Sequence, residues 1–102
     1  VLDMGYTLLE DCGFTRDEAV RATGQLVMRN IENVLEAGCD GALTGPIERN
    51  DIETVKKHIA CMQNDDSDDV SLYKMLGTKL AKIAEKKNPD KDYTQMMELL
   101  RG

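Results

Sequence analysis

The sequence predicts an all-α fold, and its composition and its apolar spacing both indicate this class. The 102 residues include three tyrosines, one phenylalanine and two prolines, whereas Leu, Met, Ala, Glu and Lys are plentiful. That composition favours helices over a sheet-based core. Apolar residues also recur at three- and four-residue steps along most of the chain, as in amphipathic helices. With 41% hydrophobic residues, the chain is long enough for one domain with a single core and too short for two. We therefore expect residues 1–102 to form one domain of about five helices around one core.

Two helices are expected in the first 38 residues. The first has apolar residues at helical spacing along one face and ends at Gly13, and we expect this apolar face to be buried. It consists of Leu2, Gly5, Tyr6, Leu9 and Cys12. Thr15 and Glu18 form a capping-box pattern that opens the longest helix, which runs to about Ala37 before Gly38 stops it. One arc of this second helix is apolar and consists of Ala19, Ala22, Leu26, Val27, Ile31 and Val34.

Two asparagines interrupt the apolar arc of the long helix. Asn30 falls near its middle and Asn33 falls on its flank, so at least one amide is expected to leave bulk water and to need hydrogen-bond partners. Two interpretations remain open for these amides. They bond to a neighbouring helix or loop, or they belong to a ligand site.

Three more helices are expected after residue 50. Asn50 or Asp51 can cap a helix whose apolar side consists of Ile52, Val55, Ile59 and Met62. Residues 63–69 are acidic, but they lack the glycine and the final glutamate of an EF-hand calcium loop, so we interpret them as a solvated turn that caps the next helix. That helix ends near Lys87 and buries one face, which consists of Val70, Tyr73, Leu76, Leu80, Ile83 and Ala84. Asn88 is expected to cap a last helix with Pro89 in its first turn and with Tyr93, Met96, Met97 and Leu100 buried.

The loop of residues 42–51 is the strongest candidate for function. Gly45 can adopt backbone conformations that are closed to other residues, and Pro46 fixes its own φ and restricts Gly45. A stiff loop of this kind can hold Thr44 and Arg49 in fixed directions, and binding groups are often found on loops of rigid scaffolds. The alternative is a plain connector between helices, because Gly-Pro pairs mark turns in general.

Charge and cysteine content exclude several classes of function. The net charge of −6 argues against a nucleic-acid surface, which needs clustered Lys and Arg. Three widely spaced cysteines and one histidine support neither a disulfide framework nor a zinc site, and they favour a reducing, cytoplasmic setting. No apolar run or leader pattern points to a membrane or to export. Dinucleotide, phosphate-loop, hydrolase and zinc-protease motifs are also missing, so no self-contained active site is visible.

The remaining polar residues can be grouped as one candidate site if helical phasing brings them toward the loop. In that site Arg49 can bind an anionic substrate through a bidentate contact, and His58 or Tyr73 can donate or accept a proton. A lone histidine beside an apolar face is otherwise a hydrogen-bonded structural residue. The full group consists of Asn30, Asn33, Thr44, Arg49, Asp51, His58 and Tyr73.

The loop and its surroundings resemble the DUF2520 family, the helical C-terminal part of Rossmann-like proteins that are assigned as oxidoreductases. In that family the usual run is A-L-T-G-P-I-x-R-G-D, followed by a helix of the T-V-x-x-H type and a later tyrosine. This chain matches the pattern over nearly its whole length and departs at Asn50, where glycine is usual. The matching residues are Ala42, Leu43, Thr44, Gly45, Pro46, Ile47, Arg49, Asp51, Thr54, Val55, His58 and Tyr73, with Asn33 upstream.

The resemblance implies a domain similar to the C-terminal helical domain of 6-phosphogluconate dehydrogenase-like and pyrroline-5-carboxylate reductase-like enzymes. A preceding Rossmann domain of the same protein would bind NAD(P), and the helical domain would contact a small-molecule substrate and form a homodimer. Its site residues would be His58, Asn33 and Tyr73 for catalysis, and Thr44, Gly45, Pro46, Arg49, Asp51 and Asn30 for the substrate. The chain starts at Val1 among apolar residues with helical spacing, which indicates a C-terminal fragment. Without the Rossmann domain, we expect this fragment to hold no cofactor and to be inactive alone. The alternative is a non-enzymatic helical module that binds a partner protein.

Overall fold

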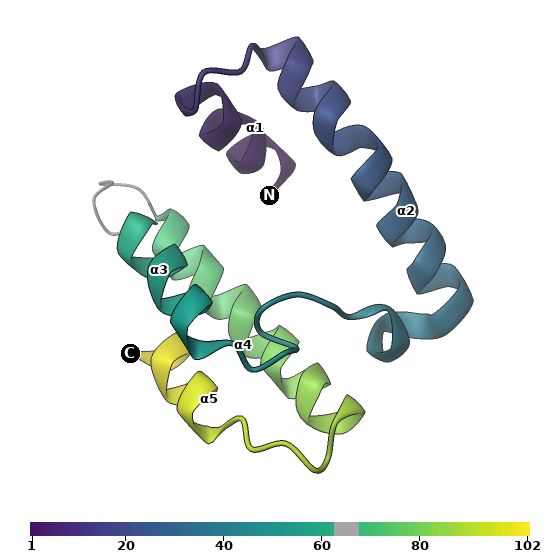
Figure 1. Ribbon diagram of the computed structural model, residues 1–102, viewed down its shortest axis with the longest axis vertical. Coiled ribbons are helices and arrows are strands. Elements are labelled where there is room, and N and C mark those ends of the chain that lie inside the picture. The colour runs from purple at the N-terminus through teal and green to yellow at the C-terminus, as the bar shows by residue number, and fades with distance from the viewer. Residues whose placement is uncertain (63–67) are drawn as a thin grey trace. The chain divides into compact units, whose positions relative to one another are not determined.

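The computed structural model describes residues 1–62 and 68–102, and this part of the chain contains five α-helices and no strand (Figure 1). The helices are α1 (Leu2–Asp11), α2 (Arg16–Ala42), α3 (Ile52–Met62), α4 (Asp69–Lys87) and α5 (Thr94–Arg101). The prediction of an all-α fold with about five helices is confirmed. The chain forms two compact units, unit 1 (Val1–Gly38) and unit 2 (Cys39–Gly102). None of the described helices has both the length and the apolar character of a membrane span.

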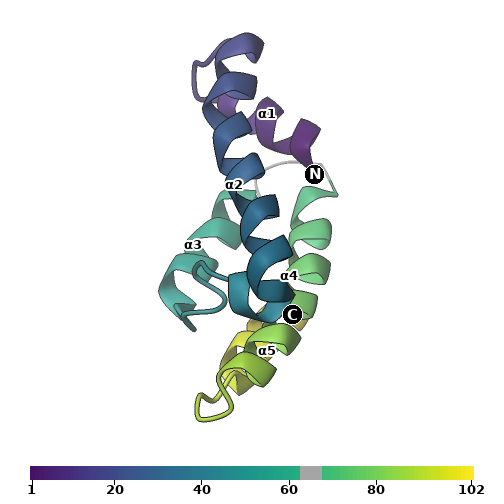
Figure 2. The same ribbon diagram turned by 90° about the vertical axis from the view of Figure 1, so that its right-hand side faces the viewer.

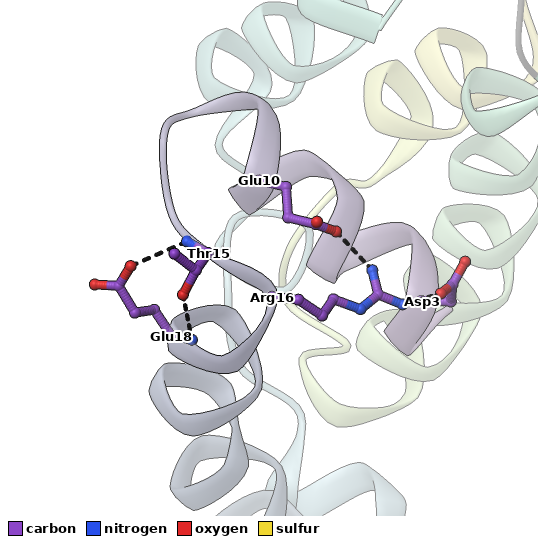
Figure 3. Close-up of polar contacts among 5 residues, drawn as sticks. All are labelled: Asp3, Glu10, Thr15, Arg16 and Glu18. Carbon is purple, nitrogen blue, oxygen red and sulfur yellow. Dashed lines mark hydrogen bonds and ion pairs between the residues drawn. The ribbon is translucent and has the colours of Figure 1, made fainter.

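The boundary between α1 and α2 follows the local signals in the sequence. Glu18 N–H donates to Thr15 Oγ1 at 3.1 Å, and Thr15 N–H donates to Glu18 Oε1 at 3.0 Å, so the predicted capping box is present (Figure 3). Arg16 then reaches back to α1, where its guanidinium donates to Glu10 Oε1 at 2.8 Å and also binds Asp3 (Figure 3). These contacts tie α1 to the first turn of α2.

The long helix stops being regular where the sequence predicts. Gly38 has φ 76° and ψ 172°, which is not a helical conformation, so residues 39–42 form a separate short turn beyond a kink. Glycine adopts positive φ without the steric penalty of a Cβ atom. The predicted stop at Gly38 is therefore confirmed.

The predicted burial of the two N-terminal helices is wrong. No residue of α1 is buried, and in α2 only Ala19 is buried among the described residues. On the predicted apolar arc, Leu26 is 61% exposed and Ile31 is 53% exposed, and both Asn30 and Asn33 are exposed, so neither amide leaves water. The reason is length, because ten residues of α1 extend only about 15 Å and can cover only part of a helix as long as α2.

Unit 2 holds the hydrophobic core, in which α3, α4 and α5 pack on one another (Figures 1 and 2). Its buried members are Ile47, Val55, Ile59, Ala81, Ala84, Tyr93, Met96, Met97 and Leu100. The predicted inner faces of α3 and α5 are largely confirmed. On α4 the small residues face the core, whereas Leu76 and Leu80 are exposed, contrary to the prediction.

The connection from α4 to α5 differs from the prediction. Asn88 does not cap the last helix but ends α4, and its N–H donates to Ala84 O at 2.8 Å. Pro89 follows directly, and proline is common just after a helix end because it cannot continue the helix. The N-cap position of α5 is Tyr93, and Asp92 just before it accepts from the first helical N–H, that of Thr94, through Oδ1 at 2.9 Å. The predicted acidic turn falls mostly on residues 63–67, which lie outside the described residues, and Asp68 makes no side-chain cap bond.

Candidate functional site

The loop that joins α2 to α3 is closed by its own backbone hydrogen bonds. Gly45 has φ 105°, a conformation that favours glycine, as the sequence predicts. Arg49 N–H donates to Gly45 O at 3.0 Å, and Asp51 N–H donates to Pro46 O at 2.8 Å. The bend therefore sets the direction in which Arg49 leaves the backbone.

Asp51 caps α3 and also lies near Arg49. Its carboxylate accepts from the Thr54 hydroxyl at 2.7 Å and from the Thr54 N–H at 3.1 Å. The Thr54 hydroxyl, then the Thr54 amide, and then the positive charges of Arg49 and Lys57 lower the pKa of Asp51 below its usual value. Arg49 Nη2 lies 4.0 Å from Asp51 Oδ2, and the Arg49 side chain is 59% exposed. This loose ion pair leaves guanidinium donors of Arg49 open to an external anion.

Asn50 directly precedes the cap residue Asp51 in the loop. Its φ is 61°, in the left-handed region, which asparagine tolerates better than most residues. The side chain donates to Asp92 O at 2.9 Å, while its buried Oδ1 has no hydrogen-bond partner in the described part of the protein. Asparagine thus preserves the backbone conformation that glycine would supply.

Residues 87–93, late in the sequence of unit 2, hold the loop, and no sequence pattern indicated this. The buried Tyr93 hydroxyl donates to Glu48 O. Asn88 Nδ2 donates to that hydroxyl at 3.1 Å and to Glu48 Oε1 at 3.2 Å. Lys87 Nζ donates to Leu43 O at 2.7 Å and lies 3.7 Å from Glu48 Oε1. The hydrogen-bonded partners are 40 to 45 residues apart in sequence, except for Asn88 and Tyr93, so no local spacing could have predicted them.

His58 on α3 and Tyr73 on α4 form a pair. His58 Nδ1 lies 3.0 Å from the Tyr73 hydroxyl, and the two rings meet edge to face with centroids 5.9 Å apart. Burial raises the pKa of Tyr73, so the phenol stays protonated at neutral pH. The pair can transfer a proton, and its hydrogen bond and ring contact also link α3 to α4. Because His58 follows Asp51 by seven residues, it lies about 10 Å along the helix from the cap.

The predicted site residues fall in both units. Thr44, Arg49, Asp51, His58 and Tyr73 belong to unit 2, and Thr44 is exposed at the start of the loop. Asn30 and Asn33 belong to unit 1, where Asn30 borders a shallow hollow of about 210 Å³ with Ile31, Val34 and Leu35. The assignment of catalytic and substrate-binding roles to these residues stays a prediction. Within the described residues, His, Cys, Asp and Glu form no group that could hold a metal ion.

The chain matches the model of a known family over most of its length. The family model described as a domain of unknown function, DUF2520, matches residues 1–80. This stretch includes the loop, the His58–Tyr73 pair and all of unit 1. Neither a curated protein nor a solved structure matches the chain significantly.

Proposed function

Because this chain belongs to the DUF2520 family, we propose that it is the substrate-side and dimerisation domain of an NAD(P)-dependent oxidoreductase of the cytoplasm. A Rossmann domain of the same protein would hold the dinucleotide, since such a site needs a strand, a glycine-rich turn and a helix start. The chain has no G-x-G-x-x-G motif, so catalysis requires the two parts together.

The observation that carries this proposal is the exposed guanidinium of Arg49 on an anchored loop. A guanidinium presents paired donors that match a carboxylate or phosphate, and Arg49 is held only loosely by Asp51. A substrate anion would therefore compete with Asp51 for Arg49. The His58–Tyr73 pair would supply a proton donor or acceptor when the nucleotide domain brings the reacting centre to it.

The test uses the intact parent protein. NAD or NADP binding is measured first, and a screen of small organic acids and phosphate esters then identifies a substrate. Arg49→Ala should raise KM for an anionic substrate roughly tenfold or more, because a charge-assisted hydrogen bond is lost, while helical content stays unchanged. Arg101→Ala removes another exposed arginine of unit 2 and serves as the matched control. An unchanged KM in the Arg49→Ala protein would remove Arg49 from the site.

One observation favours a second candidate, a helical module that binds a partner protein without catalysis. Within unit 1, α2 exposes large apolar side chains, of which Ile31, Val34 and Leu35 line one shallow hollow. Exposed apolar patches often mark interaction sites. An upstream coding sequence with G-x-G-x-x-G after a strand would favour the oxidoreductase, whereas a start codon directly before Val1 would favour the module. Gel filtration tests association separately, because both proposals permit a dimer.

A further inference from the structure

We propose that Lys87, Asn88 and Tyr93 are positioning residues for Arg49, acting through the backbone of the loop that carries it. The proposal rests on the proposed function for the ligand that Arg49 would bind. Its structural part, the control of the loop by a distant segment, stands on contacts within unit 2 alone.

The contacts fall on the peptide groups that determine where Arg49 points. The carbonyl that Tyr93 binds is that of Glu48, which belongs to the same planar peptide group as the Arg49 nitrogen. Fixing this plane fixes one side of the Arg49 backbone. The second anchored carbonyl, that of Leu43, lies before the Gly45–Pro46 bend and is bound by Lys87. The bend is thus held on both sides.

The anchoring groups are themselves well held. Tyr93 is 2% exposed, and its ring is part of the unit 2 core, so its hydroxyl has a fixed position. That hydroxyl accepts from Asn88 while it donates to the loop, so its single proton is committed to the Glu48 carbonyl. The Glu48 carboxylate is mostly buried and meets both Asn88 and Lys87. A buried acceptor with charged and neutral donors resists movement because release would leave these groups unpaired.

The anchoring residues also lie outside the part of the chain that the family model matches. The match ends at residue 80, whereas the anchors are residues 87–93. The direction of Arg49, which belongs to the matched part, therefore depends on residues in the unmatched part. Differences between relatives in this later segment are expected to change how the loop presents its arginine.

Amide hydrogen exchange of the full chain, followed by NMR, tests the proposal. Tyr93→Phe keeps the buried ring and removes the hydroxyl. The Arg49 and Asp51 amides, which bond to Gly45 and Pro46, should then exchange roughly tenfold faster. The Ile59 amide in α3 should keep its protection. Tyr73→Phe is the matched control, because it removes the hydroxyl that bonds to His58 and should leave the loop amides unchanged.

The outcomes separate positioning from general support of the fold. Unchanged exchange at Arg49 and Asp51 overturns the proposal, and faster exchange that includes Ile59 overturns it as well, because Tyr93 would then stabilise the whole unit. If the Tyr93→Phe chain fails to fold, Lys87→Met removes the ammonium group from the edge of the unit and should loosen the same amides. A titration with inorganic phosphate, read at the Arg49 side chain, tests the ligand role. Failure of phosphate to bind wild type would count against the proposed function and would leave the exchange result to decide the anchoring.

Discussion

Gly77 is the position where one added methyl group tests how closely unit 2 is packed. It is buried in the middle of α4, and a Cβ atom there would lie 2.9 Å from Leu100 Cδ2 and 3.2 Å from Ile47 Cδ1. Carbon atoms pack best at about 3.5–4.0 Å. Both neighbouring methyl groups must therefore move in a Gly77→Ala protein.

Two opposing free-energy terms decide the stability of the Gly77→Ala protein. Alanine gains about 1 kcal/mol over glycine in a helix interior, and overpacking a core costs about 1–3 kcal/mol. Leu100 and Ile47 are both buried members of the core, so their methyl groups move against other packed side chains. We expect the overpacking cost to exceed the helix gain, with a net loss of about 1 kcal/mol and a Tm lower by about 4–8 °C.

Thermal unfolding followed by far-ultraviolet circular dichroism measures this effect. Gly24→Ala is the matched control, because it lies inside α2 and no described atom falls within 4 Å of the added Cβ. This control should gain helix stability without any loss of Tm. In a Leu100→Val background the cost of Gly77→Ala should shrink, since the nearest methyl group is withdrawn. A Gly77→Ala protein that melts as high as wild type would refute the close-packing argument.

Two further predictions concern the loop. Asn50→Gly should be more stable than Asn50→Ala by about 1–2 kcal/mol, because only glycine adopts positive φ without a Cβ penalty; equal denaturant midpoints for the two variants would contradict the assigned backbone conformation. Asp51→Ala should destabilise α3 at neutral pH, and because the folded pKa of Asp51 is lowered, its contribution is present above pH about 4 and is lost as the pH falls through the folded pKa. Urea unfolding at several pH values should therefore show the gap between wild type and Asp51→Ala closing in acid, and a gap that is constant with pH would argue against the cap.

Local signals were enough to predict several of the helix boundaries. The Thr15–Glu18 capping box, the stop at Gly38 and the cap at Asp51 each involve residues close in sequence, and each is present. The prediction for Asn88 was wrong because the local sequence is compatible with two roles for this residue. A residue before proline can end one helix or cap the next. In the structure Asn88 ends α4, and its side chain bonds to Glu48 and Tyr93, which are partners that the local sequence does not indicate.

Burial and loop anchoring could not be predicted, because both depend on partners distant in sequence. The apolar arc of α2 has the spacing of a buried face, yet unit 1 offers little surface to cover Leu26 or Ile31. In the candidate site, the sequence correctly singled out Gly45 as conformationally special and grouped His58 with Tyr73, which lie within hydrogen-bond distance. It did not single out Glu48, because nothing near this residue distinguishes it from an ordinary exposed glutamate.

The course of α4 has a practical consequence for choosing fragments to express. The family match stops inside this helix, and the side chains that fill the centre of unit 2, such as Met96 and Leu100, come later. A clone that ended at the family boundary would cut α4 and leave Val55 and Ile59 facing water. Useful fragments must therefore extend through Leu100, and alignments restricted to the matched stretch would omit six of the nine buried core residues described in unit 2.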